Sequence, residues 1–151
     1  MVGGILNGFD IVTRHLIMEK DLNAEGHLFG GAMLAWLDEA TGVYVMEKIG
    51  YPDFVTVGLD DVYFKAPGHR GDVITIYCRI VKTGASSITA ETKAVNHELR
   101  TGVDREIITC HFTFVCLKDH KAYPYFKSPE YRNWLKRQQA AGRPKTRRRA
   151  P

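Results

Sequence analysis

A single long helical segment, residues 28–49, is the feature that most constrains the fold of this chain. It is rich in Ala, Leu, Met and Glu, and Gly50 and Pro52 follow it as residues that end helices. The other patterned stretches before residue 128 have the Val, Ile, Thr and aromatic content of β-strands. One helix therefore has to pack against the whole sheet.

Five extended stretches accompany the predicted helix. One precedes it and four follow it, and they span residues 9–18, 54–65, 72–84, 86–98 and 105–118. The turn sequences PGHRGD, TGAS and LRTGVD separate the last four stretches. Because these connections have hairpin length, we expect the four strands to be antiparallel neighbours in chain order.

Residues 105–118 show the two-residue period of a strand with one apolar face. Cys110, Phe112, Phe114 and Cys116 share one face, whereas polar residues take the other. An apolar sheet face needs a covering layer, and the helix can supply it. We therefore expect an α+β fold in which one long central helix is wrapped by a curved antiparallel sheet.

The chain has two parts of different composition. Its 151 residues, 44% of them hydrophobic, suit one domain with a real core, which we place at residues 1–127. The tail, residues 128–151, is basic: after residue 130 there are eight Arg or Lys and no acid, which leaves thirteen basic and seventeen acidic residues in residues 1–130. We interpret the tail as a partly disordered end that begins helical, with contact to nucleic acid or an anionic membrane as the alternative.

The cysteines indicate a reduced core. Cys78, Cys110 and Cys116 are odd in number and contain no CxxC pair, which argues against a disulfide framework and a zinc site. The histidines show no metal-ligand spacing either, so we expect no metal. We see neither a signal-peptide pattern nor an apolar run that could cross a bilayer, and we expect a cytoplasmic protein without a membrane partner.

Asp38 stands out within the helical segment because it is an acid among Trp36, Leu37 and Ala40. An acid in a long helix is usually solvated, so this residue alone does not indicate a function. A carboxylate held among apolar side chains is different, because desolvation raises its proton affinity and makes it a usable general base. The residues around it decide between these interpretations.

Asp38 ends a longer motif, N-x-x-G-H-L-F-G-G-x-x-L-x-W-x-D, which begins at Asn23. The segments VYFKAPGHRGD and KTGASS follow it. In order and spacing, these motifs resemble the hotdog-fold acyl-CoA thioesterases, specifically the YciA and cytosolic acyl-CoA hydrolase group. The resemblance covers about residues 10–125 and leaves out the tail.

The resemblance implies a hotdog fold, with a central helix wrapped by five to six strands, and an active site at a dimer interface. It implies an enzyme, an acyl-CoA thioester hydrolase that releases free acid and CoA and needs no cofactor. The implied partners are acyl-CoA and copies of the same chain, as a dimer or a trimer of dimers, with no specific nucleic acid. Asp38 and Asn23 match the family's functional acid and amide, and in a dimer they can come from different subunits.

Thioester hydrolysis needs an activated water, stabilisation of an oxyanion and departure of a thiolate, so one base and one oxyanion hole suffice. Asp38 fits the base, and direct attack by Asp38 is the open alternative. Gly30 and Gly31 lie where the first N–H groups of the helix are unpaired, so they are candidates for the oxyanion hole or, alternatively, for tight packing. Asn23 is a candidate to orient water or thioester, with turn formation as the alternative.

The remaining candidates for binding CoA come from the same motifs. His27 and Phe29 precede the helix, and the loop position of His27 favours a positional role over a dyad with the acid. The other candidates are Lys65, His69, Arg70, Lys82, Gly84, Ser86 and Ser87. For residues 68–72 a charged turn is the alternative interpretation, and the basic tail is a further candidate to hold CoA phosphates.

Two other functions compete with hydrolysis. A hotdog hydratase or dehydratase usually relies on a catalytic His at the start of the helix, so the acid at Asp38 argues against it. A non-catalytic acyl-CoA sensor would use the same pocket without turnover, with the tail contacting nucleic acid. Release of free thiol from an acyl-CoA distinguishes hydrolysis from both.

Overall fold

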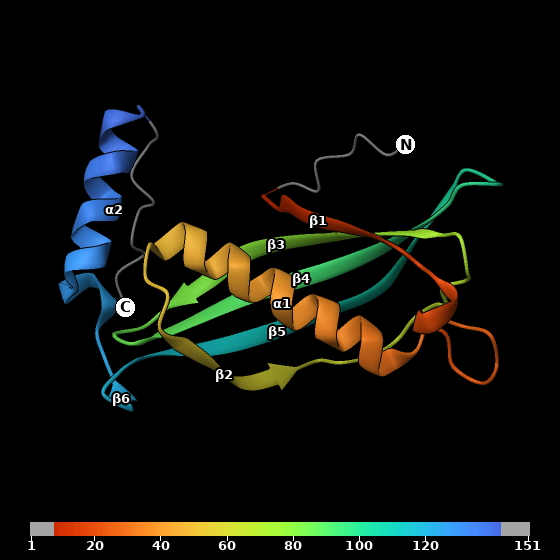
Figure 1. The fold of residues 1–151 in the computed structure, drawn as a ribbon, viewed down its shortest axis with the longest axis horizontal. Helices are drawn as coiled ribbons and strands as arrows, with labels where there is room; N and C mark the ends of the chain where they lie inside the picture. The colour runs from red at the N-terminus through yellow and green to blue at the C-terminus, as the bar shows by residue number, and fades with distance from the viewer. Residues whose placement is uncertain (1–7, 143–151) are drawn as a thin grey trace.

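The computed structural model describes residues 8–142, which form an antiparallel sheet and two α-helices (Figure 1). The strands are β1 (Asp10–Leu16), β2 (Phe54–Asp60), β3 (Val73–Thr83), β4 (Ser87–Glu98), β5 (Val103–Lys118) and β6 (Lys121–Ala122). The helices are α1 (Gly30–Ile49) and α2 (Pro129–Ala140), with single 3-10 turns η1 (Glu19–Asp21) and η2 (Tyr125–Lys127). No helix among these residues is both long and apolar enough to span a membrane.

The described strands form one six-stranded sheet in the order β1-β3-β4-β5-β2, and β6 pairs with β5. The predicted α+β class, with a sheet of five to six strands and one long central helix, is confirmed. The expectation that the last four strands are neighbours in chain order is wrong for β2, which pairs with β5 and not with β3. Residues 61–72 are a crossing connection, held by hydrogen bonds from Lys65 N to Ile107 O and from Leu28 N to Gly68 O.

Strand β2 is shorter than the predicted stretch 54–65. It ends at Asp60 because Asp61 has φ 62°, a left-handed conformation that a strand cannot continue. Aspartate tolerates this conformation better than most residues, and the Asp61 carboxylate lies 3.0 Å from Nδ1 of His111 on β5. The helix also starts later than predicted, at Gly30 instead of residue 28.

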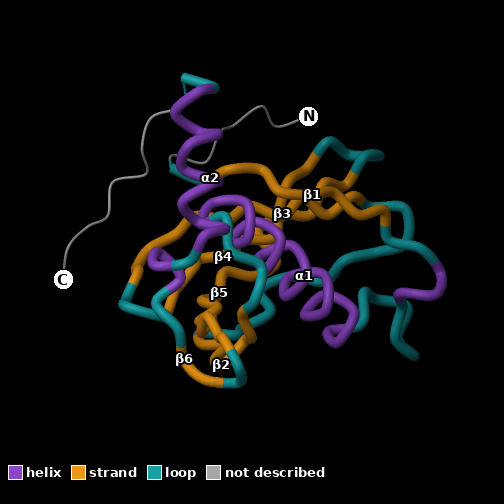
Figure 2. Tube along the Cα trace, turned by 60° about the vertical axis from the view of Figure 1, so that its left-hand side comes forward, coloured by secondary structure: helices purple, strands orange, loops and turns teal. Residues whose placement is uncertain are grey.

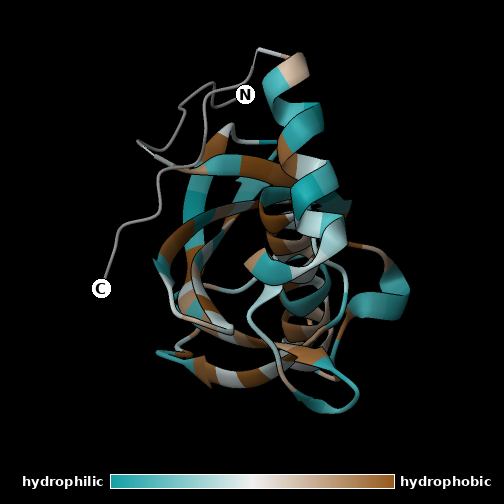
Figure 3. Cartoon of the chain, turned by 90° about the vertical axis from the view of Figure 1, so that its left-hand side faces the viewer, coloured by the Kyte–Doolittle hydropathy of each residue, from teal (hydrophilic) through white to brown (hydrophobic). Residues whose placement is uncertain are grey.

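The core lies between the sheet and one face of α1. Met33, Leu37 and Val45 of the helix are fully buried, and so are the inward residues of β3, β4 and β5. In Figure 3 the strands curve around the helix. The opposite face of α1 stays open in the single chain, where Val43 and Met46 are exposed, so the sheet wraps the helix on one side only.

Helix α2 confirms that the tail begins helical. The Ser128 hydroxyl accepts a hydrogen bond from Tyr131 N at 3.0 Å and caps the helix, and Pro129 occupies its first turn. The indole of Trp134 donates to Glu47 O of α1 at 2.9 Å. Figure 2 shows α2 projecting at the end of the sheet where α1 finishes. The basic stretch after residue 142 lies outside the described residues, and the domain boundary at residue 127 stays a prediction.

All three cysteines are free and buried, which confirms their placement in the core. Burial raises the pKa of the Cys110 and Cys116 thiols to about 12. We expect native protein to resist iodoacetamide at pH 8 because thiolate is scarce, and unfolded protein to take up three labels, counted by mass spectrometry. Rapid labelling of the cysteines in the native protein would contradict their burial.

The same burial makes stability depend on pH. Since the folded state alone resists ionisation of these thiols, the free energy of unfolding should fall as pH rises from about 9 towards 12.

Candidate active site

The Asp38 carboxylate lies on the exposed face of α1 and is held from β2. Thr56 Oγ1 donates a hydrogen bond to Asp38 Oδ1 at 2.7 Å. Among residues 8–142, Oδ2 has no protein hydrogen-bond partner, so it is available to a water molecule or a ligand. The carboxylate is therefore oriented through one oxygen and presents the other.

Asp38 opens onto a crevice between α1 and β2 with a volume of about 280 Å³. The crevice is lined mainly by apolar side chains, among them Val43, Phe54 and Phe114. The neighbours that the sequence suggested do not form it, because Leu37 turns into the core. The apolar surroundings of the acid come from the next helical turns and from the sheet.

Thr56 was missed by sequence reasoning, although it makes the one hydrogen bond that orients Asp38. Strand β2 contains a β-bulge between Thr56 and Gly58 where it pairs with β5. A glycine inside a strand pattern is a recognised sign of a bulge. Gly58 was therefore a signal of irregular pairing, but nothing in the sequence linked this strand to the acid.

Asn23 shapes the loop before the helix. Its Oδ1 accepts hydrogen bonds from Glu25 N at 3.0 Å and from His27 N at 3.1 Å, which is the turn-forming arrangement of an asparagine. The side chain is exposed. Its carbonyl oxygen is thus engaged by the backbone, whereas the Nδ2 group can still donate to a ligand.

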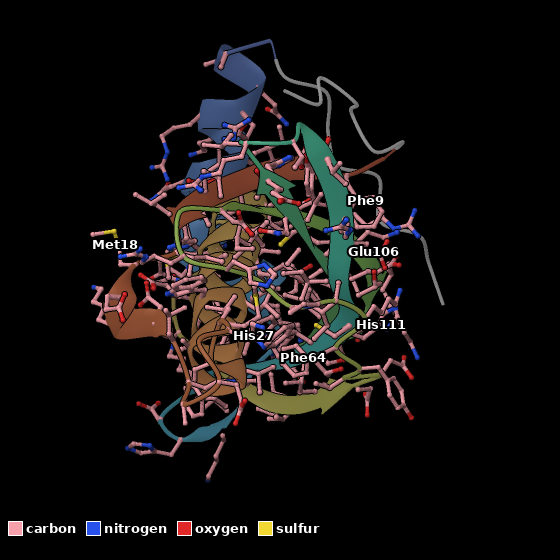
Figure 4. The ribbon with its side chains drawn as sticks, turned by 90° about the vertical axis from the view of Figure 1, so that its right-hand side faces the viewer. Phe9, Met18, His27, Phe64, Glu106 and His111 are labelled. Carbon is pink, nitrogen blue, oxygen red and sulfur yellow. The ribbon has the colours of Figure 1, made fainter. Side chains whose placement is uncertain are left out.

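Asn23, Gly30 and Lys65 line one cavity of about 390 Å³ at the start of α1, together with Phe64. His27 and Phe64 mark this end of the molecule in Figure 4. Gly30 borders Phe64, since an added β-carbon would come within 3.4 Å of its ring. The predicted amide and one predicted cation are therefore brought together with the first residue of the helix.

Gly31 makes room for a neighbouring ring. A β-carbon at this position would lie 2.6 Å from the Phe29 ring, so the ring would have to shift to admit a side chain. Phe29 is itself the residue that precedes the first turn and is exposed. The packing interpretation of Gly31 therefore has a concrete partner in the single chain, while its role as an amide donor stays a prediction.

His27 and His69 pair across two loops. They form an isolated antiparallel bridge, and their rings meet edge to face with centroids 5.0 Å apart. His69 N also donates to Oδ2 of the buried Asp72 at 3.1 Å. Asp38 lies eight residues after Gly30, or about 12 Å along the helix axis. Since His27 precedes the helix, a His27–Asp38 dyad does not form within one chain.

The predicted cations are partly engaged. Lys65 forms an ion pair with Glu106, and its hydrogen bond lowers the pKa of that carboxyl below the usual range. Arg70 lies 3.6 Å from Glu19, with both side chains exposed. Lys82 is exposed on β3. Among residues 8–142, no three His, Cys, Asp or Glu side chains are grouped to hold a metal ion.

The two predicted CoA-binding segments lie at opposite ends of β3. Residues 68–72 precede this strand, whereas Gly84, Ser86 and Ser87 form the hairpin after it, closed by a hydrogen bond of 2.7 Å from Gly84 N to Ser87 O. With eleven residues, β3 separates the two ends by roughly 30 Å. The structure therefore does not bring these two groups together within one chain.

Comparison with known proteins shows which family this chain belongs to. The sequence profile described as Thioesterase superfamily matches residues 25–103. An uncharacterized acyl-CoA thioester hydrolase of Zymomonas mobilis is 35% identical over 111 residues, 72% of this chain and 72% of that protein. The acyl-CoA thioester hydrolase YciA of Salmonella typhimurium is 36% identical over 80 residues, which are 53% of this chain but only 59% of that protein.

A solved structure supports the same family assignment. The hexameric thioesterase y2039 of Yersinia pestis is 33% identical and superposes with a TM-score of 0.71, over 76% of this chain and 93% of that chain. The profile match includes the helix that carries Asp38, and the resemblance and the hotdog fold expected from the sequence are confirmed. The chain belongs to the thioesterase superfamily.

Proposed function

We infer that this protein is an acyl-CoA thioesterase, which hydrolyses acyl-CoA to a free carboxylic acid and CoA. The observation that carries this function is the Asp38 carboxylate, fixed by Thr56 and open through Oδ2 at the mouth of an apolar crevice. The relatives from Zymomonas mobilis and Salmonella typhimurium are named acyl-CoA thioester hydrolases, which supports the same substrate class. We expect the protein to act in the cytoplasm and without a cofactor.

The chemistry needs one activated water. Asp38 accepts its proton as a general base, or attacks the thioester carbonyl directly as a nucleophile. Backbone N–H groups at the start of α1 stabilise the oxyanion, an interaction worth about 3–4 kcal/mol in comparable sites. The CoA thiolate is a good leaving group, so no strong acid is required. The cavity beside Asn23 receives the CoA side of the substrate.

These groups converge only if two chains contribute. Within one chain the helix start and Asp38 are about 12 Å apart along α1. Strand β2 ends the sheet order, so its outer edge has no strand partner among residues 8–142, and Val55 and Val57 on it are exposed. Pairing of this edge with a second copy would place the Asn23 loop of one subunit near Asp38 of the other. The related y2039 is described as hexameric.

Two measurements test this function. We expect the protein to release free thiol from butyryl-CoA or longer esters, whereas a sensor or a hydratase would leave the thioester intact. We also expect sedimentation to show a dimer or larger assembly, and specific activity to fall when dilution dissociates it. A fully active monomer at assay concentration would remove the shared site, and absence of thiol release would remove the hydrolase.

A further inference from the structure

Two cavities adjoin on the exposed face of α1. The first, about 280 Å³, lies between α1 and β2 and includes Asp38. The second, about 420 Å³, lies between the end of α1 and α2. Both are lined by Met46 and Pro52. We call the two neighbouring cavities together the acyl groove, which lies along α1 from Asp38 to α2. Figure 1 shows α2 beside the end of α1.

Apolar side chains line both parts of this groove, together with the polar residues Glu39, Glu130 and Asn133. Val43, Phe54 and Phe114 contribute near Asp38, and Tyr51 and Trp134 contribute at the far end. The groove follows the eleven residues of α1 after Asp38, or about 16 Å along the axis. An elongated apolar space that starts at a candidate hydrolytic carboxylate matches an extended hydrocarbon chain.

Trp134 closes the far end as a fixed wall. Its indole N–H donates to Glu47 O at 2.9 Å, and its ring stacks on Tyr131 with centroids 5.7 Å apart. The ring also fills the space beside Gly50, where a β-carbon would approach it to 2.1 Å. Arg137 of α2 lines the same end of the groove, so a hydrocarbon end that reaches this point would meet a charged side chain.

We propose that the acyl groove holds the acyl chain of the substrate and that α2, through Trp134, sets the longest chain accepted. The proposal rests on the proposed thioesterase function and adds the determinant of chain length. Helix α2 lies outside residues 25–103, the part that matches the family profile. An acyl chain that fits the groove buries more apolar surface with each added methylene. An acyl chain that extends past Trp134 buries no further surface.

Binding to the Asp38→Asn variant, which leaves the ligand intact, tests the groove apart from turnover. For straight-chain acyl-CoAs measured by calorimetry, we expect Kd to fall about fourfold per added methylene until the chain reaches Trp134, and then to level or rise. Adding Met46→Trp fills the junction of the two cavities. It should reduce the ratio of affinities for decanoyl-CoA and acetyl-CoA at least tenfold, whereas Lys136→Trp, on the exposed side of α2, should leave that ratio within twofold.

Trp134 is tested in the same series. Trp134→Ala should move the levelling point to longer chains, and Trp134→Phe, which keeps a ring at the wall, should retain the original profile. Equal affinity of the Asp38→Asn protein for all acyl chain lengths would overturn the proposal. A Met46→Trp variant that binds every ligand more weakly by the same factor and changes the oligomeric state would also overturn it, because this face would then be a subunit contact. Loss of thiol release in the wild-type protein instead counts against the hydrolase, since the affinity series does not depend on turnover.

Discussion

Replacing Asp38 by Asn should lower the turnover of acyl-CoA by two to four orders of magnitude, the range that a positioned general base contributes. The amide keeps the size of the side chain and can still accept the hydrogen bond from Thr56, so folding and CoA binding should persist. Release of free thiol measures the loss, and circular dichroism with calorimetric titration of CoA verifies that the protein is intact.

Three companion variants identify the role of the acid. Thr56→Val keeps the shape of the strand but removes the hydrogen bond that orients the carboxylate, so we expect a smaller loss than for Asp38→Asn. Asn23→Ala should also cost less, since the base remains. His27→Ala should cost least, because His27 serves the loop. A full-speed Asp38→Asn protein would show that the acid is merely solvated, and an inactive His27→Ala beside an active Asp38→Asn would transfer the chemistry to the histidine.

Gly50→Ala should destabilise the protein more than the addition of a single methyl group at any other described glycine. Gly50 has φ 62°, and a β-carbon would lie 2.1 Å from the Trp134 ring. The left-handed conformation costs about 1–2 kcal/mol, and displacing the half-buried indole adds about 2 kcal/mol. Together these effects should lower the melting temperature by roughly 10 °C, measured by thermal unfolding, and should shift tryptophan fluorescence towards exposed indole.

Gly102→Ala is the matched control for that experiment. Gly102 also has a positive φ, 70°, but nothing lies within 4 Å of an added β-carbon. It should therefore show the conformational cost alone, without a change in fluorescence. Equal effects of the two substitutions would mean that Trp134 does not pack on Gly50 in solution.

Local pattern predicted the elements of this fold better than their arrangement. The alternation of Cys110, Phe112, Phe114 and Cys116 is confirmed, because a strand with one buried face imposes a two-residue period on its own residues. The place of β2 beside β5 was not predictable in this way, since it depends on a connection that passes the start of α1. The early end of β2 depends on one left-handed residue, Asp61, which no periodicity reveals.

The site shows the same division. Motif spacing singled out Asp38 and Asn23, and their catalytic roles stay predictions. The hydrogen bond from Thr56 joins residues 18 positions apart on two elements, and the contact of Trp134 with the end of α1 spans 87 positions. Such pairs follow from the packing of helix against strand, which short sequence patterns do not encode.

The bulge in β2 limits how this strand can evolve. Thr56 and Leu59 are three residues apart, so a regular strand would point them to opposite faces. The bulge lets Thr56 pair with Phe114 and Leu59 pair with Phe112, so that one reaches Asp38 while the other packs on the core. Deleting a single residue here would take away either the partner of the carboxylate or a core side chain. We therefore expect related chains to keep the number of residues in β2 fixed and to vary in length at the hairpins instead.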